Sequence, residues 1–263
     1  MKIMTCIKQV PASNQVKVDQ ETGVLIRDGN NTKMNPYDLY AIETALQIKE
    51  RANQAVVTSI SMGPPSAKQV LTEALWMGSD DAVLVSDRKF AGADVVATSY
   101  TLSQAIASQG DVDLIICGKQ TTDGDTAQVG PEMAEYLNIP HIPYVNEVIE
   151  INDQSIIVKS HYDQHEEIVE VTFPCLITVD KGIYTPRLPS YLRGKQFESY
   201  EIKTISMKDF DDQNESRYGL KGSPTQVERI FPPSEHTEHE KWIGSFHETS
   251  DQLYEKLKEL KFI

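Results

Sequence analysis

The sequence predicts an α/β protein with a doubly wound, mostly parallel sheet, an appended antiparallel hairpin, an extended C-terminal arm and a final helix. Two observations carry this prediction. In the first half of the chain, short apolar segments alternate with segments of helical spacing, which is typical of right-handed βαβ units. After about Val145 the pattern changes to two strand-like segments joined by polar residues, which is typical of an antiparallel hairpin.

Four apolar segments in the first half have the length and β-branched content of buried strands, at 2–10, 55–62, 81–86 and 112–118. Helical spacing between them predicts helices over 35–50, 65–78 and 94–108. The first helix has Asn35 as a candidate N-cap and Pro36 at its first position. Gly78 stands where the second helix should end, and Asp94 precedes the third. This alternation predicts a parallel sheet with helices on both faces.

The second half predicts a hairpin, an arm and a helix. Strands are expected at 155–162 and 166–173, followed by an apolar segment at 175–180. Residues 184–195 contain two prolines, and the charged stretch to Ser234 has weak periodicity, so we expect an arm here and not a core. Helical spacing resumes through Leu253, Leu257 and Leu260. We therefore expect one α/β domain over 1–184, including the hairpin, and a second part over 185–263.

Composition excludes several classes of protein. The chain has 263 residues, 40% of them hydrophobic and 24% charged, which is ordinary for a globular protein. No apolar segment approaches membrane-spanning length and no signal sequence precedes the first strand, so we expect a cytoplasmic protein. A formal charge of −14 disfavours nucleic-acid binding. The three cysteines are separated and lie in apolar segments, so we expect buried free thiols.

The most informative stretch is CGKQTTDGDTAQVGPEMAEYL, residues 117–137, where a loop of small and hydroxyl residues joins an expected strand to an expected helix. Ligands of open parallel sheets bind at the carboxyl ends of the strands, where such loops meet. The glycines let the backbone approach a ligand, the threonines offer hydroxyls, and a helix beginning near Thr126 would direct free N–H groups at it. The pattern predicts a phosphate or pyrophosphate site, with a structural turn as the alternative.

Asp123 and Asp125 qualify this prediction, because they repel phosphate unless they cap the helix or face ribose hydroxyls. The loop also lacks the P-loop sequence and the G-x-G-x-x-G spacing of dinucleotide folds. Four further residues at the same sheet edge favour a nucleotide site, because a doubly wound sheet brings them together. They are Cys6, Asn35, Met62 and Asp94.

Over nearly its whole length the sequence resembles the β subunit of electron transfer flavoproteins. The resemblance rests on CIKQVP at 6–11, MNPYDLYAIETAL at 34–46, the block 61–87 and the loop 118–137. The family signature near the hairpin is matched in its second half by Glu167-Ile168-Val169 and by Pro174 with the four residues after it. Its first half differs, because SHYDQHE stands where the family has an acidic residue followed by glycines.

The resemblance implies an adenine-nucleotide α-hydrolase-like fold and a nucleotide pocket. The matching positions are Cys6, Asn35, Pro36, Tyr37, Asp38, Met62, Gly118, Lys119, Gln120, Thr121, Thr122, Asp123, Gly124, Asp125, Thr126, Ala127, Gln128 and Val129. Ordinary members of the family hold AMP in this pocket as a structural ligand. A branch found in anaerobes holds FAD, which takes hydride from NADH and divides the electrons between two acceptors.

The loop favours the FAD branch, because AMP-holding members tend to carry bulkier acidic and amide residues where this chain has Gly124, Asp125, Thr126 and Ala127. Asp94 and Thr98, in the first turn of a helix, are further candidates to face a diphosphate. We expect FAD as cofactor and NADH as electron donor, with AMP as the alternative. No side-chain acid, base or nucleophile is expected, since the chemistry is that of the cofactor.

The resemblance also implies partners. The proline-flanked segment aligns with the family's recognition loop, in which an exposed leucine docks on a partner dehydrogenase; Leu188 has that place, beside Tyr191, Leu192, Arg187 and Arg193. Glu167 matches a position that pairs with an arginine of the α subunit, and residues 200–234 would embrace that subunit. We expect an acyl-CoA dehydrogenase as partner, or an FAD-dependent lactate dehydrogenase, with ferredoxin as the second acceptor.

Two other hypotheses remain. The pairs His161 with His165 and His236 with His239 have the spacing of metal ligands, but the first spans a turn and the second lies in an acidic run, so we expect no metal. A stand-alone nucleotide-binding protein of the universal-stress type would share the α/β domain. The hairpin, the arm and the recognition-loop block weigh against it.

Overall fold

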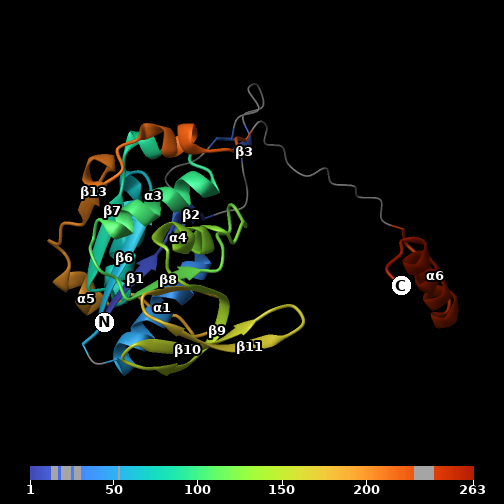
Figure 1. Ribbon diagram of the computed structural model, residues 1–263. Helices are drawn as coiled ribbons and strands as arrows, with labels where there is room; N and C mark the ends of the chain where they lie inside the picture. Colours follow the sequence, from blue (N-terminus) through green and yellow to red (C-terminus); the bar gives the residue numbers. More distant parts are fainter. Residues whose placement is uncertain (13–16, 19–24, 27–30, 53, 228–239) are drawn as a thin grey trace. The chain divides into compact units, whose positions relative to one another are not determined.

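The computed structural model describes residues 1–12, 17–18, 25–26, 31–52, 54–227 and 240–263 (Figure 1). The chain divides into two compact units, Met1–Glu228 and Arg229–Ile263. The functional division expected at residue 184 stays a prediction. No helix in the described ranges is long and apolar enough to cross a bilayer.

A nine-stranded sheet forms the centre of the first unit, in the order β11-β10-β9-β12-β8-β1-β6-β7-β13. Seven of its strands run parallel, namely β1 (Lys2–Cys6), β6 (Val56–Met62), β7 (Asp81–Val85), β8 (Leu114–Gly118), β9 (His141–Ile151), β12 (Cys175–Val179) and β13 (Lys203–Ile205). The hairpin of β10 (Ser155–His161) and β11 (Glu166–Thr172) joins β9 in antiparallel fashion. Both the parallel sheet and the appended hairpin are therefore confirmed.

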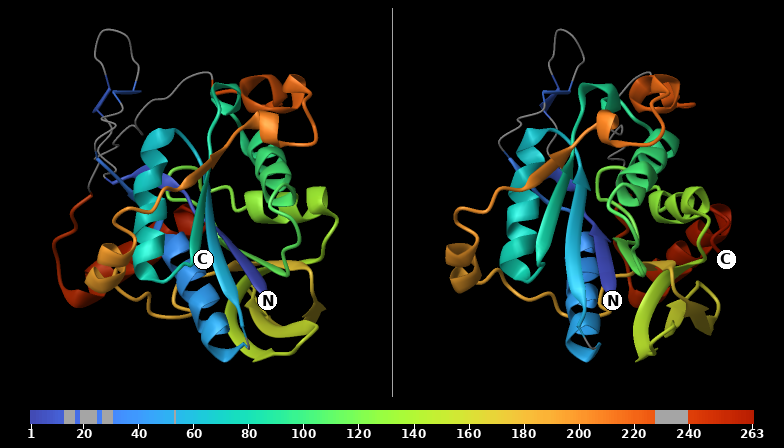
Figure 2. Two further views of the ribbon diagram at one scale, coloured as in Figure 1. Left: turned by 90° about the vertical axis from the view of Figure 1, so that its left-hand side faces the viewer. Right: turned by 60° about the vertical axis from the view of Figure 1, so that its left-hand side comes forward.

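Helices cover both faces of the sheet (Figure 2). The helices are α1 (Pro36–Arg51), α2 (Lys68–Met77), α3 (Val95–Ala107), α4 (Val129–Leu137) and the short α5 (Tyr191–Gln196). Ile42 of α1 and Leu71 of α2 belong to one buried cluster, whereas Leu102 of α3 and Met133 of α4 belong to the other. The doubly wound arrangement is confirmed, and each layer is held by burial of one apolar helix face.

Small elements complete the description. The two-stranded sheets pair β2 (Gln9–Pro11) with β5 (Thr32–Met34) and β3 (Lys17–Val18) with β4 (Leu25–Ile26). The 3₁₀ turns are η1 (Pro65–Ala67), η2 (Arg88–Phe90), η3 (Met207–Asp209), η4 (Glu215–Arg217) and η5 (Gly219–Gly222).

Local sequence signals set most helix ends. Asn35 occupies the N-cap of α1 with Pro36 after it, Asp94 caps α3 through a bond from the Ala97 N–H, and Gly78 ends α2 with a φ of 148°. The expected start of the next helix near Thr126 was wrong. Helix α4 begins at Val129, because the backbone at Asp125 and Ala127 takes positive φ values of 52° and 55°, which a right-handed helix does not allow.

The expectation of an arm without core contacts was wrong for part of residues 200–227. Strand β13 extends the sheet beside β7, and residues after it return to pack against the α3 face. Buried Phe210 stacks on Phe90 with ring centroids 5.6 Å apart, and Tyr218 is also buried. The periodicity is weak because a three-residue strand and single 3₁₀ turns are too short to produce one. Residues 228–234 of the expected arm lie outside the described residues.

The second unit contains α6 (Phe246–Glu259), which confirms the helix expected at the C-terminus. Ser245 and Glu248 form a capping box at its start. Leu253 is half exposed and Leu260 lies just beyond the last turn.

Candidate functional site

The predicted site residues gather at the carboxyl edge of the central strands. Cys6, at the end of β1, lies opposite Ile60 of β6 and Cys117 of β8, so the loops after these strands leave the sheet together. The N-terminus of α1 and the residues after Gly118 lie at this edge, where open α/β sheets bind ligands. Ligand binding at this edge of the sheet stays a prediction.

Asn35 fastens the loop after β8 to the start of α1. Its side chain is fully buried, and Nδ2 donates to the carbonyl oxygen of Gln120 at 2.9 Å and to Asp38 Oδ1 at 2.9 Å. The N–H of Thr122 donates to Asn35 Oδ1 at 3.2 Å. All these bonds lie within the protein, so Asn35 shapes the loop by holding its backbone in place.

Asp38 forms the buried floor beneath this loop. It is 4% exposed and accepts a hydrogen bond from the Lys8 N–H at 2.7 Å. Burial raises the pKa of this carboxyl to about 7, although bonds from Asn35 and Lys8 oppose the rise. A Cβ at Gly118 would lie 2.5 Å from Asp38 Oδ1 and 2.8 Å from the Tyr37 carbonyl carbon. Glycine is therefore required here for close approach between β8 and α1.

The segment before α4 presents free backbone donors. The N–H groups of Thr126, Ala127 and Gln128 donate to no acceptor within the described part of the chain. Left-handed backbone at Asp125 and Ala127 alternates with right-handed backbone at Gln128, an arrangement that forms anion-binding nests. These groups precede the N-terminus of a nine-residue helix, where the macrodipole favours negative charge.

The two acidic residues of the loop are paired. Lys8 Nζ lies 2.8 Å from Asp123 Oδ1, and Gln120 Nε2 donates to Asp125 Oδ1 at 2.7 Å. Burial opposes ionisation of Asp123, but Lys8 outweighs it and the pKa of this carboxyl is lowered. Sequence reasoning missed Lys8, although it lies inside the CIKQVP block. The pair reduces the repulsion that Asp123 would exert on an anion.

Asp94 and Thr98 were expected to face a diphosphate, but the carboxylate of Asp94 bonds to groups of the protein itself. Asp94 Oδ1 caps α3, and Oδ2 accepts bonds from the N–H of Thr225 at 2.9 Å and from its hydroxyl at 2.7 Å. Asp94 therefore fastens the segment after η5 to α3. Thr98 lies in the first turn of the same helix and is half-buried. Their contact with a ligand stays a prediction.

The cysteines are free and buried, as expected. Cys6 and Cys117 are neighbours on adjacent strands. A hydrogen bond that the Cys117 thiol donates to Cys6, together with burial, raises the pKa of Cys117 well above its ordinary value, and burial raises that of Cys175 to about 12. These thiols stay protonated at neutral pH, which does not suit nucleophilic catalysis.

A hollow of about 460 Å³ adjoins the loop on the side of the hairpin. Lys119 lines it, lying 2.9 Å from Asp180 and 4.8 Å from the ring centre of Tyr144. The hairpin turn supplies the opposite wall, where Tyr162 stacks on His165 with ring centroids 4.9 Å apart. No group of three or more His, Cys, Asp or Glu side chains in the described ranges is arranged to hold a metal ion.

Comparison with known proteins identifies the family. Residues 22–208 match the model of the electron transfer flavoprotein domain. The chain is 43% identical over 260 residues to the electron transfer flavoprotein subunit beta of Thermoanaerobacterium thermosaccharolyticum, with 98% of each chain covered. The chain belongs to the electron transfer flavoprotein β-subunit family.

Two further members of the family carry more specific names. The chain is 42% identical to subunit CarD of the caffeyl-CoA reductase-Etf complex of Acetobacterium woodii, with both chains fully covered. It is also 41% identical over 240 residues to protein FixA of Sinorhizobium fredii, covering 89% of this chain and 84% of that one.

The proline-flanked segment at 184–195 exposes three apolar side chains. Leu188, Tyr191 and Leu192 are 86%, 77% and 79% exposed, and we call them the docking surface. Arg187 and Arg193, expected as charges around this surface, direct their guanidinium groups to α1 and to the end of α2. Their contact with a partner stays a prediction, as does that of exposed Glu167, which bonds to His165 at 3.0 Å.

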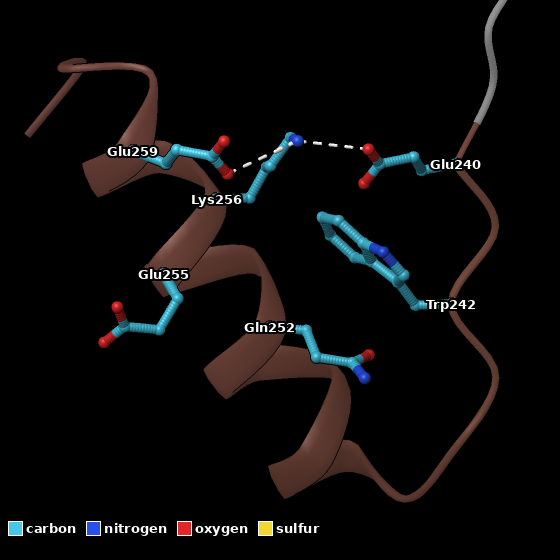
Figure 3. Close-up of a pocket in the computed structure, with 6 residues that line it drawn as sticks. All are labelled: Glu240, Trp242, Gln252, Glu255, Lys256 and Glu259. Atoms are coloured by element: carbon cyan, nitrogen blue, oxygen red, sulfur yellow. Dashed lines mark hydrogen bonds and ion pairs between the residues drawn. The ribbon is translucent and has the colours of Figure 1, made fainter.

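The second unit of this family member has a cavity of its own, of about 400 Å³ (Figure 3). Lys256 bridges Glu240 at 3.0 Å and Glu259 at 3.4 Å, with Trp242 and Gln252 beside them. Three glutamates line it against one lysine, so it does not suit a phosphate group. None of the sequence-predicted site residues lies there.

Proposed function

We propose that this β subunit binds FAD in the loop 118–129, takes electrons from NADH and divides them between ferredoxin and a partner flavin dehydrogenase. The observation that carries the proposal is the row of free N–H groups at Thr126, Ala127 and Gln128, ahead of the α4 N-terminus. Such a row suits phosphate oxygens, because each donor gains a bond that the described residues do not supply.

Small residues support a pyrophosphate over a single phosphate. Gly124 and Ala127 leave the backbone accessible, whereas bulkier side chains at these positions are typical of family members that hold AMP. Lys119 belongs both to this loop and to the wall of the neighbouring hollow, which offers room to a ligand that extends past the loop. The likeness to a subunit of the caffeyl-CoA reductase-Etf complex also supports a place in a reductase assembly.

In this proposal the side chains position the cofactor and do no chemistry themselves. Bound FAD supplies hydride acceptance from NADH and electron transfer onward. Asn35 holds the loop backbone, and Lys8 compensates the charge of Asp123 beside the diphosphate. Asp38 accepts bonds from the Lys8 N–H and from Asn35 Nδ2 beneath the loop. The raised pKa values of Cys117 and Cys175 agree with a site that uses no thiolate nucleophile.

The proposed partners are the α subunit of the electron transfer flavoprotein and a flavin dehydrogenase. The docking surface offers apolar contacts of the kind that dominate transient interfaces. An acyl-CoA dehydrogenase is the first candidate, since one relative belongs to a complex that acts on a CoA thioester. A lactate dehydrogenase of the FAD type is the second.

Cofactor content of the purified α/β heterodimer tests the proposal. We expect a second FAD beyond that of the α subunit, and rapid bleaching of the flavin absorbance by NADH under anaerobic conditions. AMP in place of the second FAD, with no reduction by NADH, overturns the FAD proposal and supports a structural AMP site.

A variant localises the cofactor to the loop. Ala127→Glu adds a carboxylate among the free N–H groups, so we expect loss of the second FAD and retention of the heterodimer. Ala91→Glu adds the same charge at an exposed position and serves as the matched control. Equal FAD loss in both variants would contradict the assignment of the loop.

A further inference from the structure

The docking surface is carried on a segment that is held on both sides by contacts with buried groups. The segment has little regular structure of its own, because α5 has only six residues and buries none of its side chains. Three large apolar side chains on such a segment would be expected to collapse onto the protein. Leu188, Tyr191 and Leu192 instead stand exposed, so contacts elsewhere must fix the backbone.

The first anchor is Glu43, two turns into α1. Its side chain is 3% exposed and accepts three bonds from Arg187. Arg187 Nε donates to Oε2 at 2.8 Å, Nη2 donates to Oε1 at 2.9 Å, and the Arg187 backbone N–H donates to Oε2 at 3.0 Å. The forked side-chain pair fixes the guanidinium, and the third bond fixes the backbone immediately before Leu188.

The second anchor lies after the docking surface, at the end of α2. Arg193 Nε donates to the Leu75 carbonyl at 2.7 Å, and its Nη2 donates to the Ser79 carbonyl at 2.5 Å. The Ser190 N–H donates to the Trp76 carbonyl at 2.9 Å. Leu75 and Trp76 lie in the last turn of α2, where no helical N–H reaches the carbonyl groups, and Ser79 follows the C-cap.

The first anchor depends on Glu43 more than on any other group. Burial works against ionisation of this carboxyl, but the bonds from Arg187 outweigh it and its pKa lies below the ordinary value. The other carboxylate on Arg187 is Glu50 at 2.9 Å, whose side chain is 57% exposed. Solvent weakens that pair, and it makes no bond to the loop backbone.

We propose that Glu43 is a positioning residue that, through Arg187, holds the docking surface in the conformation that a flavin dehydrogenase acting on CoA thioesters recognises. The inference rests on the proposed function for the identity of the partner. Preorganisation of this kind raises affinity because the loop loses little conformational freedom on binding. Buried Glu43 makes no bond to the described residues of the loop 118–129 and is closed to the partner, so its effect is confined to docking.

The test uses Glu43→Gln in the α/β heterodimer, with Glu73→Gln as matched control. Glu73 is a half-buried acid of α2 whose pKa is raised by burial, and it makes no ion pair in the described ranges. The amide at position 43 keeps the size of the side chain and loses the charge that holds the fork. We expect amide hydrogen exchange over 187–193 to accelerate by about tenfold or more, with the rest of the sheet unchanged.

Electron transfer in the reverse direction, from an acyl-CoA dehydrogenase reduced by its own acyl-CoA to the flavin of the heterodimer, supplies the second readout. We expect Glu43→Gln to raise KM for the dehydrogenase by about tenfold and to leave kcat and flavin content unchanged. Arg187→Lys keeps the charge but loses the fork, so an intermediate rise in KM is expected. A purely stabilising residue would lower the unfolding temperature without this division between KM and kcat.

Each outcome decides the inference. Unchanged exchange over 187–193 in both Glu43→Gln and Arg187→Lys overturns it, as does faster exchange with unchanged KM. Leu188→Ala separates failure of the inference from failure of the proposed function. If Leu188→Ala leaves KM unchanged for acyl-CoA and lactate dehydrogenases alike, the proposed docking surface is wrong. If Leu188→Ala raises KM and Glu43→Gln does not, only the role of Glu43 is wrong.

Discussion

The cofactor loop at 118–129 and the docking surface at 188–192 are two exposed segments that the same helix holds in opposite ways. The cofactor loop presents backbone N–H groups beside the small residues Gly124 and Ala127, whereas the docking surface presents large side chains and bonds its backbone to the protein. Asn35 at the start of α1 holds the first and Glu43, two turns later, holds the second. A site for an anion needs free donors, and a site for an apolar pocket needs exposed carbon.

The buried carboxyl groups beside the two segments, Asp38 and Glu43, also differ in how they respond to pH. Asp38, beneath the cofactor loop, has a pKa raised to about 7, so it changes charge near neutrality. Glu43 has a lowered pKa, and its contribution is lost only when the pH falls below the ordinary range of a carboxyl. The comparison therefore predicts that near-neutral pH acts on the cofactor loop and leaves the docking surface unaffected.

The largest effect is expected from Gly118→Ala. The new methyl group would lie 2.5 Å from Asp38 Oδ1, so β8 and α1 must separate, at a cost of at least about 3 kcal/mol of unfolding free energy. Gly194→Ala is the control, since it lies outside the loop 118–129 and its methyl group would have its nearest neighbour, Trp76 Cε2, at an ordinary 3.5 Å. Chemical unfolding and flavin content of the heterodimer measure both. Equal losses in the two variants would break the claim of close backbone approach at Gly118.

The second effect is a pH dependence of stability carried by Asp38. A folded pKa of about 7 against an ordinary 3.8 means that the folded protein keeps a proton that the unfolded chain releases between these values. Stability therefore falls as the pH rises through this window, by at most about 4 kcal/mol, and the penalty is complete above it. Unfolding free energies of the wild type and Asp38→Asn should converge or cross as the pH rises. Parallel pH profiles would contradict the assignment.

A smaller effect, confined to docking, is expected from Leu188→Ala. Removing an exposed anchor costs about 2 kcal/mol of binding, or roughly thirtyfold in the Kd for the partner dehydrogenase, with unchanged folding. Leu220 is 55% exposed on η5 and provides the control Leu220→Ala. The Kd of each variant is measured by titrating the surface-immobilised heterodimer with acyl-CoA dehydrogenase. Equal weakening by the two substitutions would mean that docking is not localised at Leu188.

The smallest effect on stability is expected from Lys8→Met. The side chains of Lys8 and Asp123 are 45% and 33% exposed, so their ion pair changes the unfolding free energy by only about 0.5 kcal/mol. The free Asp123 carboxylate would then weaken FAD binding, more strongly at low salt. Titration of the flavin-depleted heterodimer with FAD at two salt concentrations checks this. If the affinity for FAD changes neither with the substitution nor with the salt concentration, Lys8 has no role in cofactor binding.

Much of the fold and part of the site could be predicted from sequence, because their causes are local. Alternating periods predicted the doubly wound sheet, and Asn35, Gly78 and Asp94 marked helix ends through bonds or backbone angles that involve near neighbours. The exposure of Leu188 was expected from the resemblance of its segment to the recognition loop of the family, and Leu188 is 86% exposed. Each of these features depends on a few consecutive residues, so the order of the amino acids is sufficient to reveal it.

Only the tertiary structure decided the features that join distant residues. The side chain of Asn35 bonds to residues 85 and 87 positions later along the chain, and Arg187 reaches Glu43 across 144 positions. Strand β13 and buried Tyr218 carry no periodic signal, because they are stabilised by β7 and α3 and not by their own neighbours. Sequence therefore determined most of the strands and helices, whereas packing determined strand β13 and which buried side chains hold the exposed loops in place.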